Sequence, residues 1–134
     1  MNEPNIQLYS AGALSYYGDA VLELLTRRHL LESGIGDAGE LNRMARAYVT
    51  AASQAQGYEK IKAMLTEEED MYFKRGRNHQ ANVPKSASVS QYRKATGMET
   101  LFAYLHLSGQ TERMHRLFDA AFIDDNDNTN TDKE

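Results

Sequence analysis

The stretch 14-LSYYGDAVLELLTRRHLL-31 sets the fold class of this 134-residue chain. Its apolar side chains recur at the i, i+3, i+4, i+7 spacing of a helix with one apolar face, at Leu14, Tyr17, Val21, Leu24 and Leu25. This spacing predicts a helix over about residues 13–31. Ser33-Gly34 is expected to end it, because glycine readily adopts the left-handed conformation that closes a helix.

A glycine and an acid occupy the middle of this predicted helix. Gly18 costs up to about 1 kcal/mol there relative to alanine, which suggests that another backbone or a ligand approaches it closely. Asp19 follows directly, on the side of the helix opposite the apolar face, where a solvated acid is ordinary. The pattern alone leaves both close helix packing and a ligand site open.

The rest of the chain also has helical periodicity. Thr66 with Glu69, and Ser88 with Gln91, have the spacing of capping boxes, which mark helix starts. Further helices are predicted over about 38–56, around Ile61–Leu65, over about 66–75 with Gly76 as its stop, over about 88–107, and after Thr111, with a loop at 76–87. No run alternates strictly, so the expected fold class is all-α with six or seven helices.

The predicted helix over 88–107 is apolar around nearly its whole circumference, which is typical of a central helix. Glu99 lies inside this run, and a carboxylate in apolar surroundings is costly unless a base, donors or a metal compensates it. One interpretation pairs Glu99 with Arg93 or another basic side chain. The other brings Glu99 and Asp19 together around a divalent cation such as Mg²⁺, which prefers oxygen ligands and assists phosphodiester hydrolysis. The broad apolar cover also leaves room for a subunit interface.

Composition excludes several classes of protein. The sequence has no cysteine, which removes disulfides, thiolate catalysis and cysteine-bound zinc and fits a reducing, cytoplasmic location. No stretch reaches the roughly 20 apolar residues of a membrane span, and the start, MNEPNIQLYS, has no secretory signal. We therefore expect no membrane partner.

Charge divides the chain into two parts. Residues 124–134, DDNDNTNTDKE, have five acids and one base, which accounts for the whole net charge of −4. This tail has no apolar residue and is predicted to be disordered. Residues 1–123 are expected to form one folded domain with equal numbers of acidic and basic residues.

One segment of the neutral domain is purely basic. Residues 71–94 contain six bases and no acid, and such a segment can dock a phosphate backbone even in a neutral protein. The alternative is a solvated loop with ordinary surface lysines. The six bases are Lys74, Arg75, Arg77, Lys85, Arg93 and Lys94.

Several motifs, taken in order, resemble the ribonuclease III family. Residues 14–24, LSYYGDAVLEL, resemble the signature helix of ribonuclease III catalytic domains. The match continues with RHLL at 28–31, KRGRN at 74–78, PK at 84–85, QYR at 91–93 and TGMETL at 96–101, the last similar to the family's second acidic helix. Their order, and the absence of a double-stranded-RNA-binding domain, resemble the small bacterial branch, Mini-ribonuclease III, over about residues 7–123.

The resemblance implies an all-helical, homodimeric catalytic domain and a Mg²⁺-dependent endonuclease that cuts double-stranded RNA, leaving 5′-phosphate ends. Members of the small branch are associated with maturing the base-paired stalk of precursor 23S ribosomal RNA. The expected partner is therefore an assembling large ribosomal subunit, with no DNA. On this analogy Asp19 and Glu99 are the catalytic and metal-binding acids. The expected RNA-binding residues are Lys74, Arg75, Arg77, Asn78, Lys85 and Arg93.

Two positions depart from the larger members of the family. Ser15 stands where they have a glutamate, four residues before Asp19, and Thr96 stands where they have an aspartate. Both differences are consistent with the small branch and reduce the evident carboxylates to two, with water, Ser15 or Thr96 available to fill the gaps. The alternative function is a catalytically inactive dimeric module that binds structured RNA.

Overall fold

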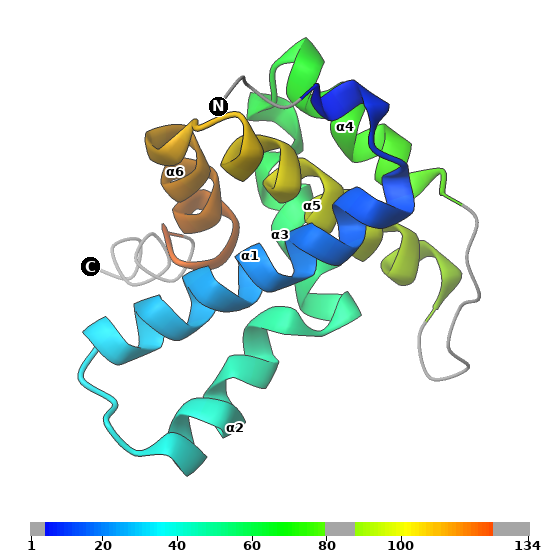
Figure 1. The fold of residues 1–134 in the computed structure, drawn as a ribbon. Helices are drawn as coiled ribbons and strands as arrows, with labels where there is room; N and C mark the ends of the chain where they lie inside the picture. The colour runs from blue at the N-terminus through cyan, green and yellow to red at the C-terminus, as the bar shows by residue number, and fades with distance from the viewer. Residues whose placement is uncertain (1–4, 80–87, 125–134) are drawn as a thin grey trace.

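The computed structural model describes residues 5–79 and 88–124, which form a bundle of helices (Figure 1). The helices are α1 (Ala11–Glu32), α2 (Ala38–Val49), α3 (Ala51–Ile61), α4 (Glu67–Arg77), α5 (Val89–Leu107) and α6 (Thr111–Phe122), with 3-10 turns at Ile6–Leu8 and Lys62–Met64. These ranges contain no strand, and the predicted all-α fold is confirmed. The predictions for Lys85 and for the tail from residue 125 onward lie outside the described residues.

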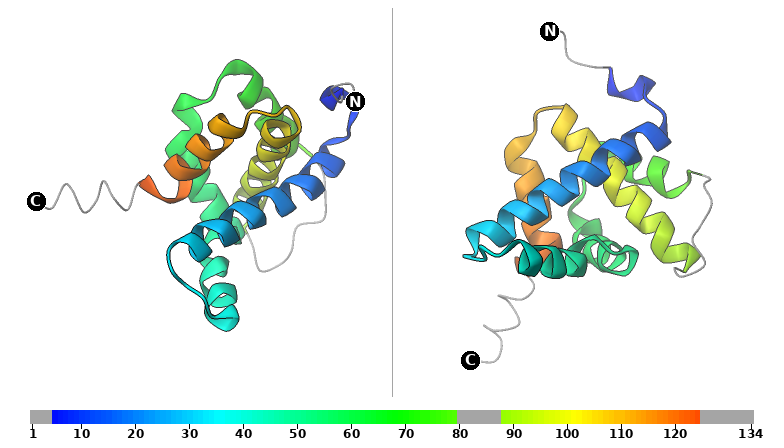
Figure 2. Two further views of the ribbon diagram at one scale, coloured as in Figure 1. Left: turned by 60° about the vertical axis from the view of Figure 1, so that its left-hand side comes forward. Right: turned by 60° about the horizontal axis from the view of Figure 1, so that its bottom comes forward.

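α5 is the central helix, as predicted. It packs against α1, α3 and α4, which surround it in the views of Figures 1 and 2. Its apolar side chains are completely buried at Met98, Leu101, Phe102, Ala103 and Leu105. Helices of the same chain cover these side chains, so this part of α5 serves the core of its own domain.

The second predicted long helix is in fact two helices, α2 and α3. Thr50 separates them with an extended backbone, φ −69° and ψ 156°. Its hydroxyl accepts a hydrogen bond from the Ser53 amide at 3.2 Å, and the Ser53 hydroxyl donates to the Ala47 carbonyl at 2.5 Å. These bonds satisfy groups that two helix ends leave open. The helical spacing of the apolar residues continues across Thr50, because that spacing carries no information about the capping bonds that separate the two helices.

Two other predicted boundaries also differ from the structure. The expected short helix around Ile61–Leu65 is the end of α3 followed by a single 3-10 turn. Gly76 lies inside α4 instead of stopping it, because α4 continues to Arg77. A Cβ at position 76 would lie only 2.6 Å from the Thr96 carbonyl oxygen of α5, so this glycine permits close packing of α4 on α5.

The predicted helix starts at Thr66 and Ser88 are confirmed. The Thr66 hydroxyl accepts from the Glu69 amide while the Glu69 carboxylate accepts from the Thr66 amide, which completes the capping box of α4. The Ser88 hydroxyl accepts from the Gln91 amide at 3.1 Å and caps α5. Gly34 follows the end of α1 with φ +99°, a left-handed conformation that favours glycine.

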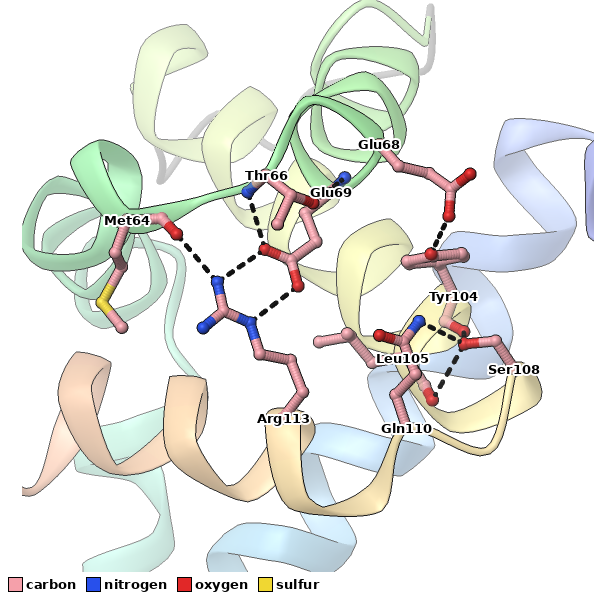
Figure 3. A network of polar contacts seen from close by, with 9 residues as sticks. All are labelled: Met64, Thr66, Glu68, Glu69, Tyr104, Leu105, Ser108, Gln110 and Arg113. Atoms are coloured by element: carbon pink, nitrogen blue, oxygen red, sulfur yellow. Dashed lines mark hydrogen bonds and ion pairs between the residues drawn. The ribbon is translucent and has the colours of Figure 1, made fainter.

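A buried ion pair joins α4 to α6 (Figure 3). Glu69 is 2% exposed, and its carboxylate accepts from Nε and Nη2 of Arg113, each at 2.8 Å. Burial alone would raise the pKa of Glu69, but the bonds from Arg113 and from the Thr66 amide outweigh it and hold that pKa below its ordinary value. This carboxylate is therefore compensated by partners within its own chain.

Within the described ranges, no helix combines the length and the apolar character that a bilayer span requires.

Candidate active site

Asp19 and Glu99 meet where α1 crosses α5. Gly18 makes this crossing close, because a Cβ at position 18 would overlap the main-chain carbonyl of Glu99. The helix-packing explanation of Gly18 is therefore correct, and the packing has a consequence for the next residue. It brings the exposed Asp19 on α1 beside the partly buried Glu99 on α5.

The surroundings of Glu99 disfavour its charged form. Burial raises the pKa of Glu99 to about 7, against an opposing effect of the Ser15 hydroxyl, which donates to Oε1 of Glu99 at 2.6 Å. Asp19 contributes to this raised pKa, through its negative charge and through a hydrogen bond between the two acids. Asp19 and Glu99 therefore form a coupled pair of carboxyl groups.

The interpretation that pairs Glu99 with Arg93 is wrong. Arg93 is exposed on α5, and the ion pairs found among the described residues involve neither Glu99 nor Asp19. The contacts of Glu99 come instead from α1, through Ser15 and Asp19. The pair thus keeps a negative charge that no basic side chain of the described ranges neutralises by direct contact.

The donor set fits a hard divalent cation. The two carboxylates and the Ser15 hydroxyl are oxygen donors, the type that Mg²⁺ prefers. In the part of the chain that the structure describes, no three His, Cys, Asp or Glu side chains gather closely enough to hold a metal. Water would therefore complete the coordination, as is usual for Mg²⁺. The Thr96 hydroxyl is engaged elsewhere, since it donates to the Tyr92 carbonyl of its own helix at 3.0 Å.

A second contact between α1 and α5, which was not predicted, joins Tyr17 to His106. The Tyr17 hydroxyl lies 2.8 Å from Nδ1 of His106, with the ring centroids 5.6 Å apart. Two signals were available in the sequence. Tyr17 directly precedes Gly18, and His106 lies seven residues after Glu99, which places both on the same face of α5.

The predicted RNA-binding residues divide into engaged and open side chains. Lys74 forms an ion pair with Asp70 at 2.8 Å. Arg75 donates to the Tyr9 carbonyl at 2.7 Å and lies over the Tyr72 ring, 5.4 Å from its centroid. Arg77 contacts its neighbour Asn78 at 3.2 Å, whereas Arg93 stands exposed on α5.

The end of α4 lies beside the start of α1. His79, just after α4, approaches Gly12 so closely that a Cβ at position 12 would lie 3.3 Å from Nε2 of that histidine. Asp19 follows Gly12 by seven residues, about 10 Å along a helix. The structure therefore brings the basic end of α4 to the same side of α1 as the acidic pair, but not into contact with it.

One cavity among the described residues lies away from the acids. It has a volume of about 580 Å³ and is a largely apolar groove between α1 and α2. Neither Asp19 nor Glu99 lines it. Leu24 and Leu31 on its α1 side are 61% and 59% exposed.

Comparisons with known proteins place this geometry in a family. The ribonuclease III domain matches residues 12–110. A Mini-ribonuclease 3 of Enterococcus faecalis is 45% identical over 108 residues, which cover 78% of this chain and 82% of the relative. A Mini-ribonuclease 3 of Symbiobacterium thermophilum is 41% identical over 109 residues, covering 81% of this chain and 84% of the relative.

A solved structure is also similar. The crystal structure of a protein from Fusobacterium nucleatum superimposes with a TM-score of 0.77 and 31% sequence identity. The match covers 86% of this chain and 93% of that one.

Proposed function

Because the chain belongs to the ribonuclease III family, in its Mini-ribonuclease 3 branch, we propose that Asp19 and Glu99 form the centre at which it cleaves double-stranded RNA. The chain is an endoribonuclease, the enzyme class of this family. One observation carries the assignment of the centre. The α1–α5 crossing brings two carboxyl groups together without an ion pair to a basic side chain of the described residues.

Asp19 and Glu99 are the residues that would hold Mg²⁺, with water as the remaining ligand. When bound, Mg²⁺ supplies Lewis-acid activation of water and of the scissile phosphate. The two acids must be ionised to bind a cation, and burial raises the pKa of Glu99 to about 7. The metal-binding form of Glu99 therefore prevails above that pH and is favoured by the cation itself.

The end of α4 and the start of α5 are the proposed contacts to the RNA backbone. The donors there come from Lys74, Arg77, Asn78 and Arg93, and from the N–H groups of Arg75 that the Tyr9 carbonyl does not occupy. Lys85, which lies outside the described residues, remains a proposed contact on the strength of the sequence. A-form RNA is recognised through its shape and its phosphates, so no sequence readout and no DNA substrate are expected. Binding through so few bases depends strongly on salt.

The functional unit is proposed to be a homodimer that cuts one strand with each protomer. Four large apolar side chains stand exposed on α1, namely Tyr16, Tyr17, Leu24 and Leu31. A soluble monomer rarely exposes so many on one helix, and a second copy of the chain would cover them. Leu24→Asp is expected to convert the dimer to a monomer in size-exclusion chromatography with light scattering. A dimer that persists in this variant would contradict the α1 interface.

The proposed natural substrate is the base-paired stalk of precursor 23S ribosomal RNA, processed in the cytoplasm on an assembling large subunit. Residues 5–79 and 88–124 form one compact set of helices with few bases for gripping RNA. Selection of one duplex by such a domain is expected to depend on how the ribosomal particle presents that duplex.

Cleavage of a labelled RNA duplex by Asp19→Asn tests the proposed centre. Loss of one carboxylate from the metal site removes several kcal/mol of transition-state stabilisation, so we expect the cleavage rate to fall about a thousandfold. Asp119→Asn, on the exposed side of α6, is the matched control and is expected to cleave normally. Undiminished cleavage by Asp19→Asn, or cleavage in excess chelator, would refute the proposal.

The backbone contacts are tested by the salt dependence of RNA binding. Arg77→Gln is expected to reduce the slope of log affinity against log salt concentration by about 1, the value for one lost phosphate contact. Arg27→Gln, which removes an exposed arginine of α1 paired with Glu23, is the control. An unchanged slope in Arg77→Gln would show that the phosphates are held elsewhere.

A further inference from the structure

Ser15 links the two helices of the acidic pair. It lies on α1 four residues before Asp19, so the two side chains share one face of the helix. Its hydroxyl donates to Oε1 of Glu99 across 84 positions of sequence, at 2.6 Å and in a partly buried position. The contact is therefore a tertiary bond made inside the proposed centre.

This bond opposes the repulsion between the two acids. Glutamate has a flexible side chain. When both acids are ionised, as cation binding requires, the charge of Asp19 favours conformations that take the Glu99 carboxylate away from it. A hydroxyl that donates to one oxygen holds the carboxylate in place and adds no charge. It also leaves further lone pairs on Glu99 open, because a carboxylate can accept about four hydrogen bonds.

No equivalent restraint comes from the other hydroxyl of the site. Thr96 donates to the Tyr92 carbonyl, within its own helix. Gly18 fixes the approach of the two backbones, but a backbone contact does not determine where the end of the Glu99 side chain lies. Ser15 is the described side chain that donates to that end.

We propose that Ser15 is a positioning residue, which holds the Glu99 carboxylate beside Asp19 before a cation arrives and thereby sets the affinity of the pair for divalent metal ions. The proposal rests on the function proposed above for this pair. Its physical basis is preorganisation, since a ligand already held in its binding position is not ordered by the metal. Partners that orient metal ligands typically change metal affinity 10–100-fold when they are removed.

Binding of Mn²⁺ in the absence of RNA tests the proposal. The free ion is followed by electron paramagnetic resonance in titrations of the parent chain, Ser15→Ala and Ser15→Thr. We expect Ser15→Ala to weaken binding about tenfold, whereas Ser15→Thr, which keeps the hydroxyl, restores binding to within about twofold. Ser90→Ala, an exposed serine in the first turn of α5, is the matched control and is expected to bind like the parent.

Cleavage kinetics provide a second readout. Ser15→Ala is expected to raise the metal concentration for half-maximal cleavage about tenfold, while the rate at saturating metal falls much less. Alanine is a good helix former, so the variant is expected to fold. Parent-like Mn²⁺ affinity in Ser15→Ala would overturn the role of Ser15 alone. Parent-like affinity in Asp19→Asn would overturn the proposed centre as well.

Discussion

Two glutamates on neighbouring helices have opposite surroundings. Glu69 on α4 receives two bonds from Arg113 and one from the Thr66 amide, which together lower its pKa despite burial (Figure 3). Glu99 on α5 receives a hydroxyl from Ser15, faces Asp19 and has a pKa raised to about 7. Burying a charge is costly in both places. At Glu69 the chain supplies the compensating cation itself, whereas at Glu99 the proposed function assigns the compensation to an external cation.

Removal of Arg113 is expected to have the largest effect on stability. Arg113→Met leaves the Glu69 carboxylate buried without its cation, and breaking a buried pair in this way costs about 3–5 kcal/mol. The free energy of unfolding, measured by urea titration, is expected to fall by that amount. Adding Glu69→Gln removes the charge but keeps an oxygen for the Thr66 amide, and should recover most of the loss. Equal stability of the single and double variants would contradict the compensated pair.

Gly18→Ala is expected to disturb the other carboxylate by forcing α1 away from α5. The new Cβ would overlap the Glu99 carbonyl, and overpacking of this kind costs about 3 kcal/mol. Gly36→Ala is the control, because no atom lies within 4 Å of a Cβ built there. Thermal unfolding of both variants checks the prediction. A Gly18→Ala protein as stable as the parent would show that the crossing is looser than described.

Glu99→Gln is expected to stabilise the protein, in a pH-dependent way. The pKa of Glu99 is about 7 in the folded chain and 4.5 ordinarily, so its ionisation opposes folding as the pH rises through this window. One pKa unit corresponds to about 1.4 kcal/mol, and part of the shift at Glu99 comes from its interaction with Asp19. We therefore expect the free energy of unfolding of Glu99→Gln to exceed that of the parent by roughly 2 kcal/mol at pH 8 and to equal it near pH 4. Urea titrations across this range test it, and a gain independent of pH would contradict it.

Urea titrations over the same pH range are expected to show the opposite pH dependence for the contribution of Glu69 to stability. The pKa of Glu69 is lowered, so its contribution to stability is present above the ordinary value of 4.5 and is lost as the pH falls through the folded pKa. Glu69→Gln is therefore expected to lose stability relative to the parent at neutral pH and to converge with it in acid.

Thr66→Ala is expected to have the smallest effect. It removes the hydroxyl that accepts from the Glu69 amide at 3.1 Å, and loss of a helix N-cap typically costs about 1 kcal/mol. Thr66→Ser keeps the cap and serves as the control in thermal unfolding. If serine and alanine destabilise equally, the cap is not what holds Glu69 at the start of α4.

Sequence patterns predicted the features that depend on residues close together in the chain. The helix starts at Thr66 and Ser88 follow from side chains that bond to amides three residues later. The central position of α5 follows from its all-round apolar surface. By contrast, the break at Thr50 depends on caps, and the role of Gly76 depends on α5, a helix more than ten residues away in sequence. Periodicity within one helix carries neither kind of information.

In the candidate active site, too, tertiary contacts could not be predicted from the local sequence. The pairing of Asp19 with Glu99 was one of two interpretations of the residue pattern, and the resemblance favoured it. Gly18 indicated a close approach but did not identify the partner. The bond from Ser15 to Glu99 and the contact of Tyr17 with His106 join residues more than eighty positions apart. The pairing of Glu69 with Arg113 also depends on tertiary packing, since α4 and α6 are separated by α5 in the chain. Which glutamate is compensated could therefore be known only from the fold.

The most direct test of the central claim is the shift in melting temperature that Mg²⁺ produces at pH 8 in the parent chain and in Asp19→Asn. A ligand that binds only the folded state raises the melting temperature. We therefore expect Mg²⁺ to stabilise the parent and the Asp119→Asn control, and to leave Asp19→Asn unchanged. An equal upward shift in Asp19→Asn would mean that the cation binds elsewhere, and would contradict the account of an acidic pair left open for it.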